Sequence, residues 1–156
     1  MNNDISQTVK RLNSTHLYII AALIILLLAV MFGLLKLPAI GEEASIIAER
    51  YAIGLTLIAI PGALKLFSNK IKKLTESETD AGIKIKQFSS AFNLRIAILG
   101  VMGLANTLFY AITANSNFMW LAVILFLAFV FCRTSEAELS AVISTKDKTE
   151  EEAEDE

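Results

Sequence analysis

The sequence has few of the residues that build catalytic or metal sites. Among its 156 residues it has one cysteine, Cys132, and one histidine, His16. A single cysteine excludes an internal disulfide, and a single histidine excludes a metal site that needs two histidines. It also lacks a nucleophile beside a base, a glycine-rich phosphate loop and paired carboxylates within an apolar segment. The sequence therefore predicts a protein that is not an enzyme and has no cofactor and no metal ion.

Apolar residues are abundant and are collected in long blocks. They make up 54% of the chain, whose mean hydropathy is +0.56. A hydrocarbon core of about 30 Å requires about 20 helical residues, and four blocks approach that length. The predicted spans are 17–37, 45–67, 92–113 and 117–133. We therefore expect an all-α integral membrane protein in which residues 17–134 form a four-helix bundle.

Positive charges are distributed unevenly between the predicted loops. The segment between the second and third spans contains five lysines, and Lys10, Arg11 and Arg133 lie near the termini. Only Lys36 and Arg50 fall on the opposite side. Because Lys and Arg accumulate on the cytoplasmic side of membrane proteins, both termini and the middle segment are predicted to be cytoplasmic. This pattern favours a multi-pass protein of the bacterial cytoplasmic (inner) membrane, with residues 1–16 as a cytoplasmic segment.

The segment between the second and third spans is predicted to be a short cytoplasmic helical hairpin. Phe67, Ile71 and Leu74 are three or four residues apart, as on one face of a helix, and Ile85, Phe88 and Phe92 repeat that spacing on the return. The lysines of this hairpin are expected to contact anionic lipid head groups, and not nucleic acid, because they alternate with Ile and not with stacking aromatic residues. They are Lys70, Lys72, Lys73, Lys84 and Lys86.

Residues 135–156 form an acidic tail. The stretch TSEAELSAVIS can add one or two helical turns, and the chain then ends in EEEAEDE. A strongly acidic segment repels itself and has little to bury. The tail is therefore expected to be cytoplasmic and mostly disordered.

Charged residues beside the spans are interpreted as interfacial anchors. From Arg50 to Lys65 the helical rise is about 22 Å, and a long basic side chain extends about 5 Å further toward water at each end. Each ionised group is thus expected to remain hydrated, outside the hydrocarbon. The predicted anchors, together with one boundary tryptophan, are Glu49, Arg50, Arg95, Arg133 and Trp120.

A second set of candidate residues lies inside the predicted spans. Asn106 is the one strongly polar side chain near the middle of a span. Small residues lie near it on the third span, and others line the second span. Small residues allow close helix packing, and a buried amide seeks a partner on another helix. The second and third spans should therefore form the centre, with the first and fourth facing lipid, and Pro61 should kink the second. Candidates for packing or for a solute path are Asn106, Thr56, Gly100, Gly103 and Pro61.

Two functional hypotheses remain from the sequence. The first is an accessory or scaffold subunit, acting through its helix faces and cytoplasmic segments on a membrane protein partner or on other copies of itself. The alternative is an oligomeric channel or small-solute carrier, with a path lined by Asn106 and Thr56. The two differ in whether Asn106 serves helix packing or lines a path.

Overall fold

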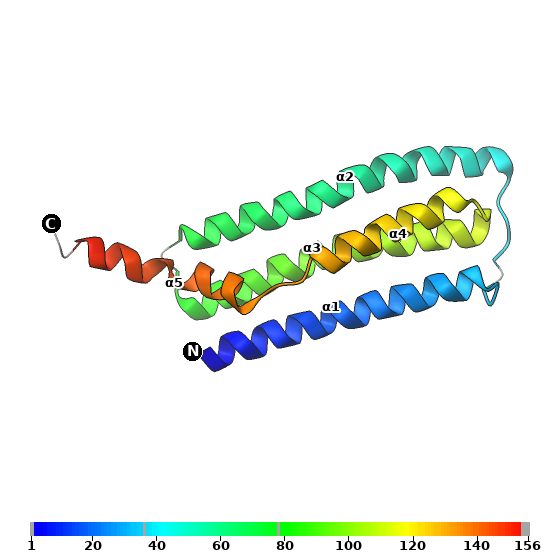
Figure 1. The fold of residues 1–156 in the computed structure, drawn as a ribbon. Helices are drawn as coiled ribbons and strands as arrows, with labels where there is room; N and C mark the ends of the chain where they lie inside the picture. Colours follow the sequence, from blue (N-terminus) through cyan, green and yellow to red (C-terminus); the bar gives the residue numbers. More distant parts are fainter. Residues whose placement is uncertain (1, 36, 78, 154–156) are drawn as a thin grey trace.

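The chain folds into long helices laid side by side (Figure 1). The computed structural model describes residues 2–35, 37–77 and 79–153. Over these residues it contains five helices and no strand. They are α1 (Asn2–Met31), α2 (Glu42–Thr75), α3 (Ala81–Thr113), α4 (Ser116–Phe131) and α5 (Glu136–Ala153). The all-α class predicted from the sequence is confirmed.

Local side-chain caps explain where α3 and α4 begin. The Asp80 carboxylate accepts a hydrogen bond from the Gly82 amide at 3.0 Å, and the Asn115 side chain accepts one from the Asn117 amide at 2.9 Å. Both satisfy amides that the first helical turn leaves unpaired. Between the two helices, Ala114 adopts a left-handed conformation with φ of 51°. The α3–α4 turn is therefore short enough to keep the two helices adjacent.

Helix α3 lies at the centre of the arrangement. It packs against α1, α2 and α4, and more locally against α5, whereas α1 and α4 barely contact each other. The turn between α2 and α3 lies at the same end as the start of α1 and most of α5, and we call this the α2–α3 end. The opposite end, with the turn 114–115, is the α3–α4 end. The expectation that the second and third spans alone form the centre is too narrow, because α1 and α4 also pack directly on α3.

Three helices are long and apolar enough to cross a membrane. They are Asn3–Met31, Glu42–Thr75 and Ala81–Thr113. Helix α4 has 16 residues, a length of about 24 Å, and it counts as a fourth span only if it is joined to Glu136–Ser144 across a bend of 56°. The chain therefore has three clear candidate spans and one that is interrupted.

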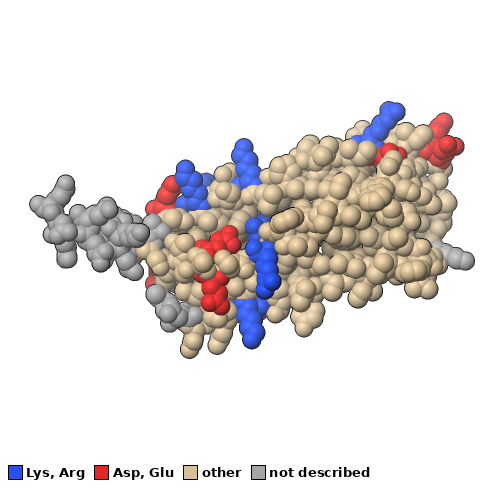
Figure 2. All heavy atoms as spheres, in the orientation of Figure 1, with Lys and Arg blue, Asp and Glu red and all other residues tan. Residues whose placement is uncertain are grey.

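Charged side chains follow the long axis in a simple pattern (Figure 2). Lys and Arg gather in a band across one level of the visible face, toward the α2–α3 end. A long uncharged surface separates this band from the α3–α4 end, where both signs reappear. An uncharged belt between two charged levels is the surface expected of a protein that crosses a membrane.

The hairpin predicted between the second and third spans is present as the ends of α2 and α3. Helix α2 remains helical through Pro61 and continues to Thr75, and α3 begins at Ala81. Phe67 and Leu74 of α2 are buried, as are Phe88 and Phe92 of α3. Their apolar stripes therefore face each other, as the spacing predicts.

The beginning of the acidic tail is helical, as predicted for the stretch TSEAELSAVIS, and it is also packed against the other helices. Helix α5 runs from Glu136 to Ala153, and Leu139, Val142 and Ile143 are buried in the same apolar cluster as Phe88. These three residues occur at helical spacing and cover the apolar side of the hairpin. The segment 136–144 is thus packed and not disordered, while residues 154–156 lie outside the described part of the chain.

Candidate functional site at the junction of α4 and α5

The junction between α4 and α5 brings together most of the buried polar side chains of the α2–α3 end. Helix α4 stops at Phe131 and α5 starts at Glu136. The carbonyls in the last turn of a helix lack intrahelical partners, so other groups must satisfy them. Here His16 of α1 and Arg95 of α3 supply those groups. The junction therefore links three helices through main-chain oxygens.

Arg95 lies inside the molecule. Its side chain is 7% exposed, and Nη2 donates to the Cys132 carbonyl oxygen at 2.6 Å. The guanidinium stacks 3.8 Å above the centre of the Phe67 ring, a favourable cation–π geometry. Its Nε atom has no hydrogen-bond partner, and no described carboxylate forms an ion pair with it.

The position of Arg95 corrects the expectation that it extends to water. The side chain is long enough to reach the boundary, which is why the sequence favours an exposed anchor. However, the break after α4 offers a free carbonyl, and Phe67 and Phe92 offer aromatic faces. These contacts hold the cation among the helices. Glu138 is near enough to attract the guanidinium electrostatically but forms no described ion pair with it, so the arrangement is not the buried ion pair typical of a proton relay.

His16 is also buried at this junction. Its Nε2 lies 2.9 Å from the Phe129 carbonyl oxygen, and its ring stacks on the Phe129 ring with centroids 5.7 Å apart. Because the oxygen can only accept, Nε2 carries the hydrogen in this contact. His16 therefore ties α1 to the end of α4.

Asn13 pairs with Thr134 in both directions. Its Nδ2 donates to the Thr134 carbonyl oxygen at 2.9 Å, and its Oδ1 accepts from the Thr134 amide at 3.3 Å. About two turns before Asn13 on α1, the Ser6 hydroxyl donates to the Glu136 carboxylate at 2.8 Å. These contacts hold the junction against α1 at two levels.

A groove of about 880 Å³ lies between α1 and the α4–α5 junction. Its lining from α1 includes Lys10, Asn13, Ser14, Leu17 and Ile20. The opposite wall includes Val130, Arg133, Thr134 and Glu136. Apart from Val9, its apolar residues lie away from the α2–α3 end and its polar residues lie nearer to it, so the groove is amphipathic along most of its length.

The predicted residues inside the spans lie elsewhere. The Asn106 Nδ2 donates to the Thr56 hydroxyl at 3.1 Å and to the Met102 carbonyl at 2.9 Å, and both Asn106 and Thr56 are 1% exposed. Oδ1 of Asn106 has no partner. Asn106 therefore joins α3 to α2 without lining the groove, while Pro61 is exposed on α2.

The predicted glycines of α3 contact α1 and α4. A Cβ placed on Gly100 would lie 3.6 Å from the Phe129 ring, and one on Gly103 would lie 3.6 Å from a Leu23 methyl group. Their small size therefore lets α1 and α4 approach α3, and not α2 as expected. Gly54 and Gly62 of α2, by contrast, have no neighbouring atoms within 4 Å of such a Cβ.

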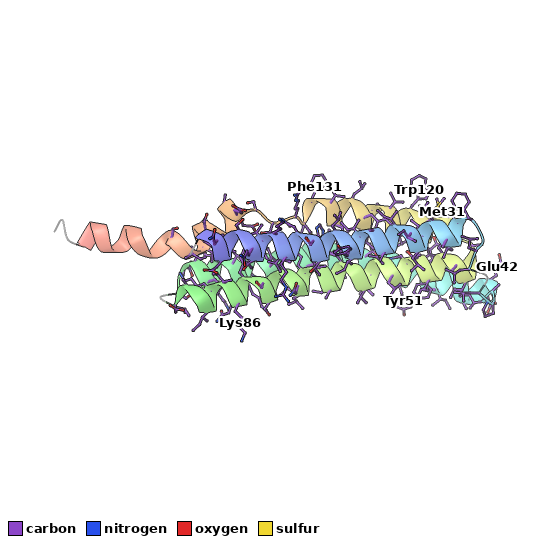
Figure 3. All side chains as sticks on the ribbon, turned by 90° about the horizontal axis from the view of Figure 1, so that it is seen from below. Met31, Glu42, Tyr51, Lys86, Trp120 and Phe131 are labelled. Atoms are coloured by element: carbon purple, nitrogen blue, oxygen red, sulfur yellow. The ribbon has the colours of Figure 1, made fainter. Side chains whose placement is uncertain are left out.

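The predicted anchors divide between the two ends. Glu49 accepts hydrogen bonds at 2.6 Å from the side-chain amides of Asn115 and Asn117, which ties α2 to the α3–α4 turn. Arg50 and Arg133 are exposed. Trp120 is 60% exposed and points away from the other helices, as does Phe131 (Figure 3).

Of the lysines expected to meet lipid head groups, Lys84 is displaced. It is 2% exposed, and its Nζ donates to the Val142 carbonyl oxygen of α5 at 3.3 Å. Packing of α5 over the hairpin covers it, so it is not available to lipid. Lys70, Lys72, Lys73 and Lys86 are exposed, and Lys72 lies 3.9 Å from the Glu76 carboxylate.

Sequence reasoning missed the partners at the junction, although one local signal was present. The run Ser135-Glu136-Ala137-Glu138 has the spacing of a helix-starting capping box, and the Ser135 hydroxyl does accept from the Glu138 amide at 3.2 Å. This signal locates the start of α5. It does not reveal that His16, Asn13 and Arg95 converge there, because those contacts span 37 to 121 residues.

The polar atoms described here are arranged for helix packing. Within the described residues, no group of three His, Cys, Asp or Glu side chains is placed to hold a metal ion. Comparison with protein-family models, with curated proteins and with solved structures finds no match to this chain.

Proposed function

We propose that this chain is a four-span protein of a bacterial cytoplasmic membrane that acts, without enzymatic activity, as an accessory or scaffold subunit. In this proposal α4 forms the short fourth span, α5 packs on the cytoplasmic hairpin, and both termini are cytoplasmic. The band of Lys and Arg at the α2–α3 end, set against Glu42 and Glu43 at the other, supports this orientation.

The observation that carries the proposal is the open face of α2. Tyr51, Leu55 and Ile58 are 56 to 76% exposed, and Gly54 and Gly62 have empty space where a side chain would be. Glycine within a helix lowers helix stability by about 1 kcal/mol relative to alanine. A glycine that faced only lipid would bring no packing gain to offset that loss. At a contact with another membrane helix it permits close approach.

The partner proposed for this face is a helix of another membrane protein. The glycines of α3 show what such a contact gains, because Gly100 and Gly103 meet side chains of α1 and α4 at ordinary van der Waals distance. Gly54 and Gly62 are eight residues apart, so they lie about 80° apart around the axis of α2, within one broad stripe. They leave room for a second helix over more than two turns.

Affinity capture of the full chain in mild detergent tests the proposal. We expect capture of an integral membrane partner that is lost in Gly54→Leu, because leucine fills the space that the partner helix requires. Ala22→Leu, on an exposed face of α1, is the matched control and should retain the partner. Recovery of copies of this chain alone, or equal capture by both variants, would contradict the accessory function.

The alternative, a channel or carrier with a path past Asn106 and Thr56, has weaker support. The two side chains bond to each other and are closed off from solvent. Neither lines the groove beside the α4–α5 junction. Flux through liposomes that disappears in Asn106→Leu while assembly persists would favour this alternative.

A further inference from the structure

The groove between α1 and the α4–α5 junction changes polarity along its length in the same direction on both walls. On α1, Lys10 and Ser14 precede Leu17 and Ile20. The facing wall runs antiparallel, so Arg133 lies toward the polar end and Val130 toward the apolar end. Ser6 bonds to Glu136 at the polar end, which fixes the register of the two walls.

Two observations place this change of polarity at the edge of the membrane. The polar end lies toward the band of Lys and Arg that crosses the molecule (Figure 2). The apolar end leads into a surface where Leu17, Tyr18 and Phe131 are 65 to 85% exposed, as lipid-facing residues are. The groove therefore extends from the head-group level into the hydrocarbon level.

The charge of the polar end favours an anion. Lys10 and Arg133 are both exposed there, and these two cations outnumber the single lining carboxylate, Glu136, which accepts a hydrogen bond from Ser6. Arginine binds phosphate through paired N–H groups, and lysine acts as a mobile point charge. The hydroxyl of Ser14 and the apolar end of the groove complete a site for an amphiphile with an anionic head.

The groove is held open by bonds that are independent of any ligand. Asn13 pairs twice with Thr134, which is 3% exposed, and His16 holds the Phe129 carbonyl. These contacts fix the floor while α1 and α4 remain apart above it. Its volume of about 880 Å³ lies within the usual range for binding pockets.

We propose that this groove binds one anionic phospholipid, with its phosphate at Lys10 and Arg133 and its upper acyl chain against Leu17, Ile20 and Val130. The proposal rests on the proposed membrane location but not on the proposed protein partner. It differs from a general attraction of lipid by surface lysines, because it requires one site of defined shape.

Native mass spectrometry of the detergent-solubilised full chain tests the proposal. Added dioleoyl phosphatidylglycerol should bind saturably at one molecule per chain, and dioleoyl phosphatidylcholine should bind more weakly. Lys10→Gln with Arg133→Gln should weaken phosphatidylglycerol binding about tenfold or more, because each cation near a lipid surface contributes substantially to attraction of anionic lipid. Arg50→Gln with Lys65→Gln also removes one arginine and one lysine, both exposed and outside the groove, and should leave binding unchanged.

A filling variant separates shape from charge. Ser14→Trp keeps both cations and introduces a large ring on the groove wall, so it should abolish the stoichiometric lipid. If the double Gln variant fails to fold, Ser14→Trp decides the question. Binding that survives Ser14→Trp, equal binding of both lipids, or equal loss in the two charge pairs would overturn the proposal.

Free phosphate is the competing source of the same chemistry. Inorganic phosphate at millimolar concentration should not displace phosphatidylglycerol, because it has no chain to occupy the apolar end. Displacement would assign the site to a soluble phosphate and would refute the lipid. A chain that remains soluble without detergent would instead refute the membrane location. The proposed protein partner is tested separately, by the affinity capture described above.

Discussion

Arg95 shows that a buried cation can be held by carbonyl and aromatic groups alone. The Cys132 carbonyl accepts from Nη2, and the Phe67 ring lies beneath the guanidinium. The stacking requires the planar guanidinium, since an ammonium has no flat face, and a lysine in the same place would direct its donors differently. The side chain therefore depends on its shape as well as on its charge.

Arg95→Lys should lower the free energy of unfolding by about 1–3 kcal/mol, because it loses the stacking and leaves the Cys132 carbonyl poorly paired. Arg133→Lys, at an exposed position close to the same junction, should change it by less than about 0.5 kcal/mol. Unfolding in mixed detergent micelles measures both. Equal changes in the two variants would mean that the Arg95 geometry contributes nothing.

The two polar atoms of the Asn106 side chain differ in their hydrogen bonding. The amide nitrogen of Asn106 has two acceptors, Thr56 and Met102, but its Oδ1 has no partner. Asn106→Leu removes both bonds together with the unpaired oxygen, whereas Thr56→Val removes one bond and leaves an N–H of Asn106 without that acceptor. An unpaired buried group costs more than the loss of an entire pair.

Thr56→Val should therefore destabilise the protein at least as much as Asn106→Leu, with a coupling energy of about 0.5–1.5 kcal/mol in the double-mutant cycle. The four proteins of the cycle are compared by the same unfolding measurement. A coupling near zero would show that the bond between α2 and α3 is not formed in the membrane.

Among the elements, α5 is the one whose role changes most between sequence and structure. Leu139 is fully buried, and Lys84 of α3 donates to the α5 backbone at Val142. A helix that the chain composition suggests is solvated instead closes the α2–α3 end. Its sequence provides three apolar side chains on one face, enough for packing against an existing surface.

Leu139→Ala should leave a cavity and cost about 2–5 kcal/mol of packing free energy. The effect should be local at first, so amide hydrogen exchange over residues 136–144 should accelerate while exchange in α3 near Asn106 stays slow. Ala137→Ser, on the exposed side of α5, serves as the control and should leave both unchanged. Uniform acceleration across the chain would show that α5 is not a separate cooperative unit.

At the scale of the whole molecule, the distribution of charge predicts which end faces the cytoplasm. Ser77 lies in the turn between α2 and α3, and Ser116 begins α4 at the other end. With the buried Cys132 changed to Ala, a cysteine at Ser116 should react with an impermeant thiol reagent in intact cells, and one at Ser77 only after lysis. The reverse pattern would invert the proposed topology.

The sequence predicts the helices better than it predicts the contacts at the junction. Hydrophobic blocks, and the helical stripes that contain Phe67 and Phe88, locate α1, α2 and α3 because these patterns are long and local. Glu49 is different, since its partners Asn115 and Asn117 are neutral side chains that the charge pattern does not pair with it. Such contacts depend on how the helices are rotated about their axes, which periodicity alone does not fix.

The break in α4 is the second feature that local pattern could not supply. No proline or glycine interrupts the run from Asn117 to Ser135, so the sequence favours one continuous span. The structure ends the helix at Phe131, where His16 and Arg95 donate to the carbonyls of Phe129 and Cys132. The interruption therefore arises from tertiary contacts and not from helix propensity.

The order of the elements along the chain has a consequence for biosynthesis. Since α5 follows the other helices, the ribosome delivers Leu139 only after α1–α4 have been made. Until then Phe88 and its neighbours lack the side chains that complete their cluster. A translation product that stops before Leu139 would display this uncovered surface to proteases, so completion of α5 gives the cell a means of distinguishing truncated copies.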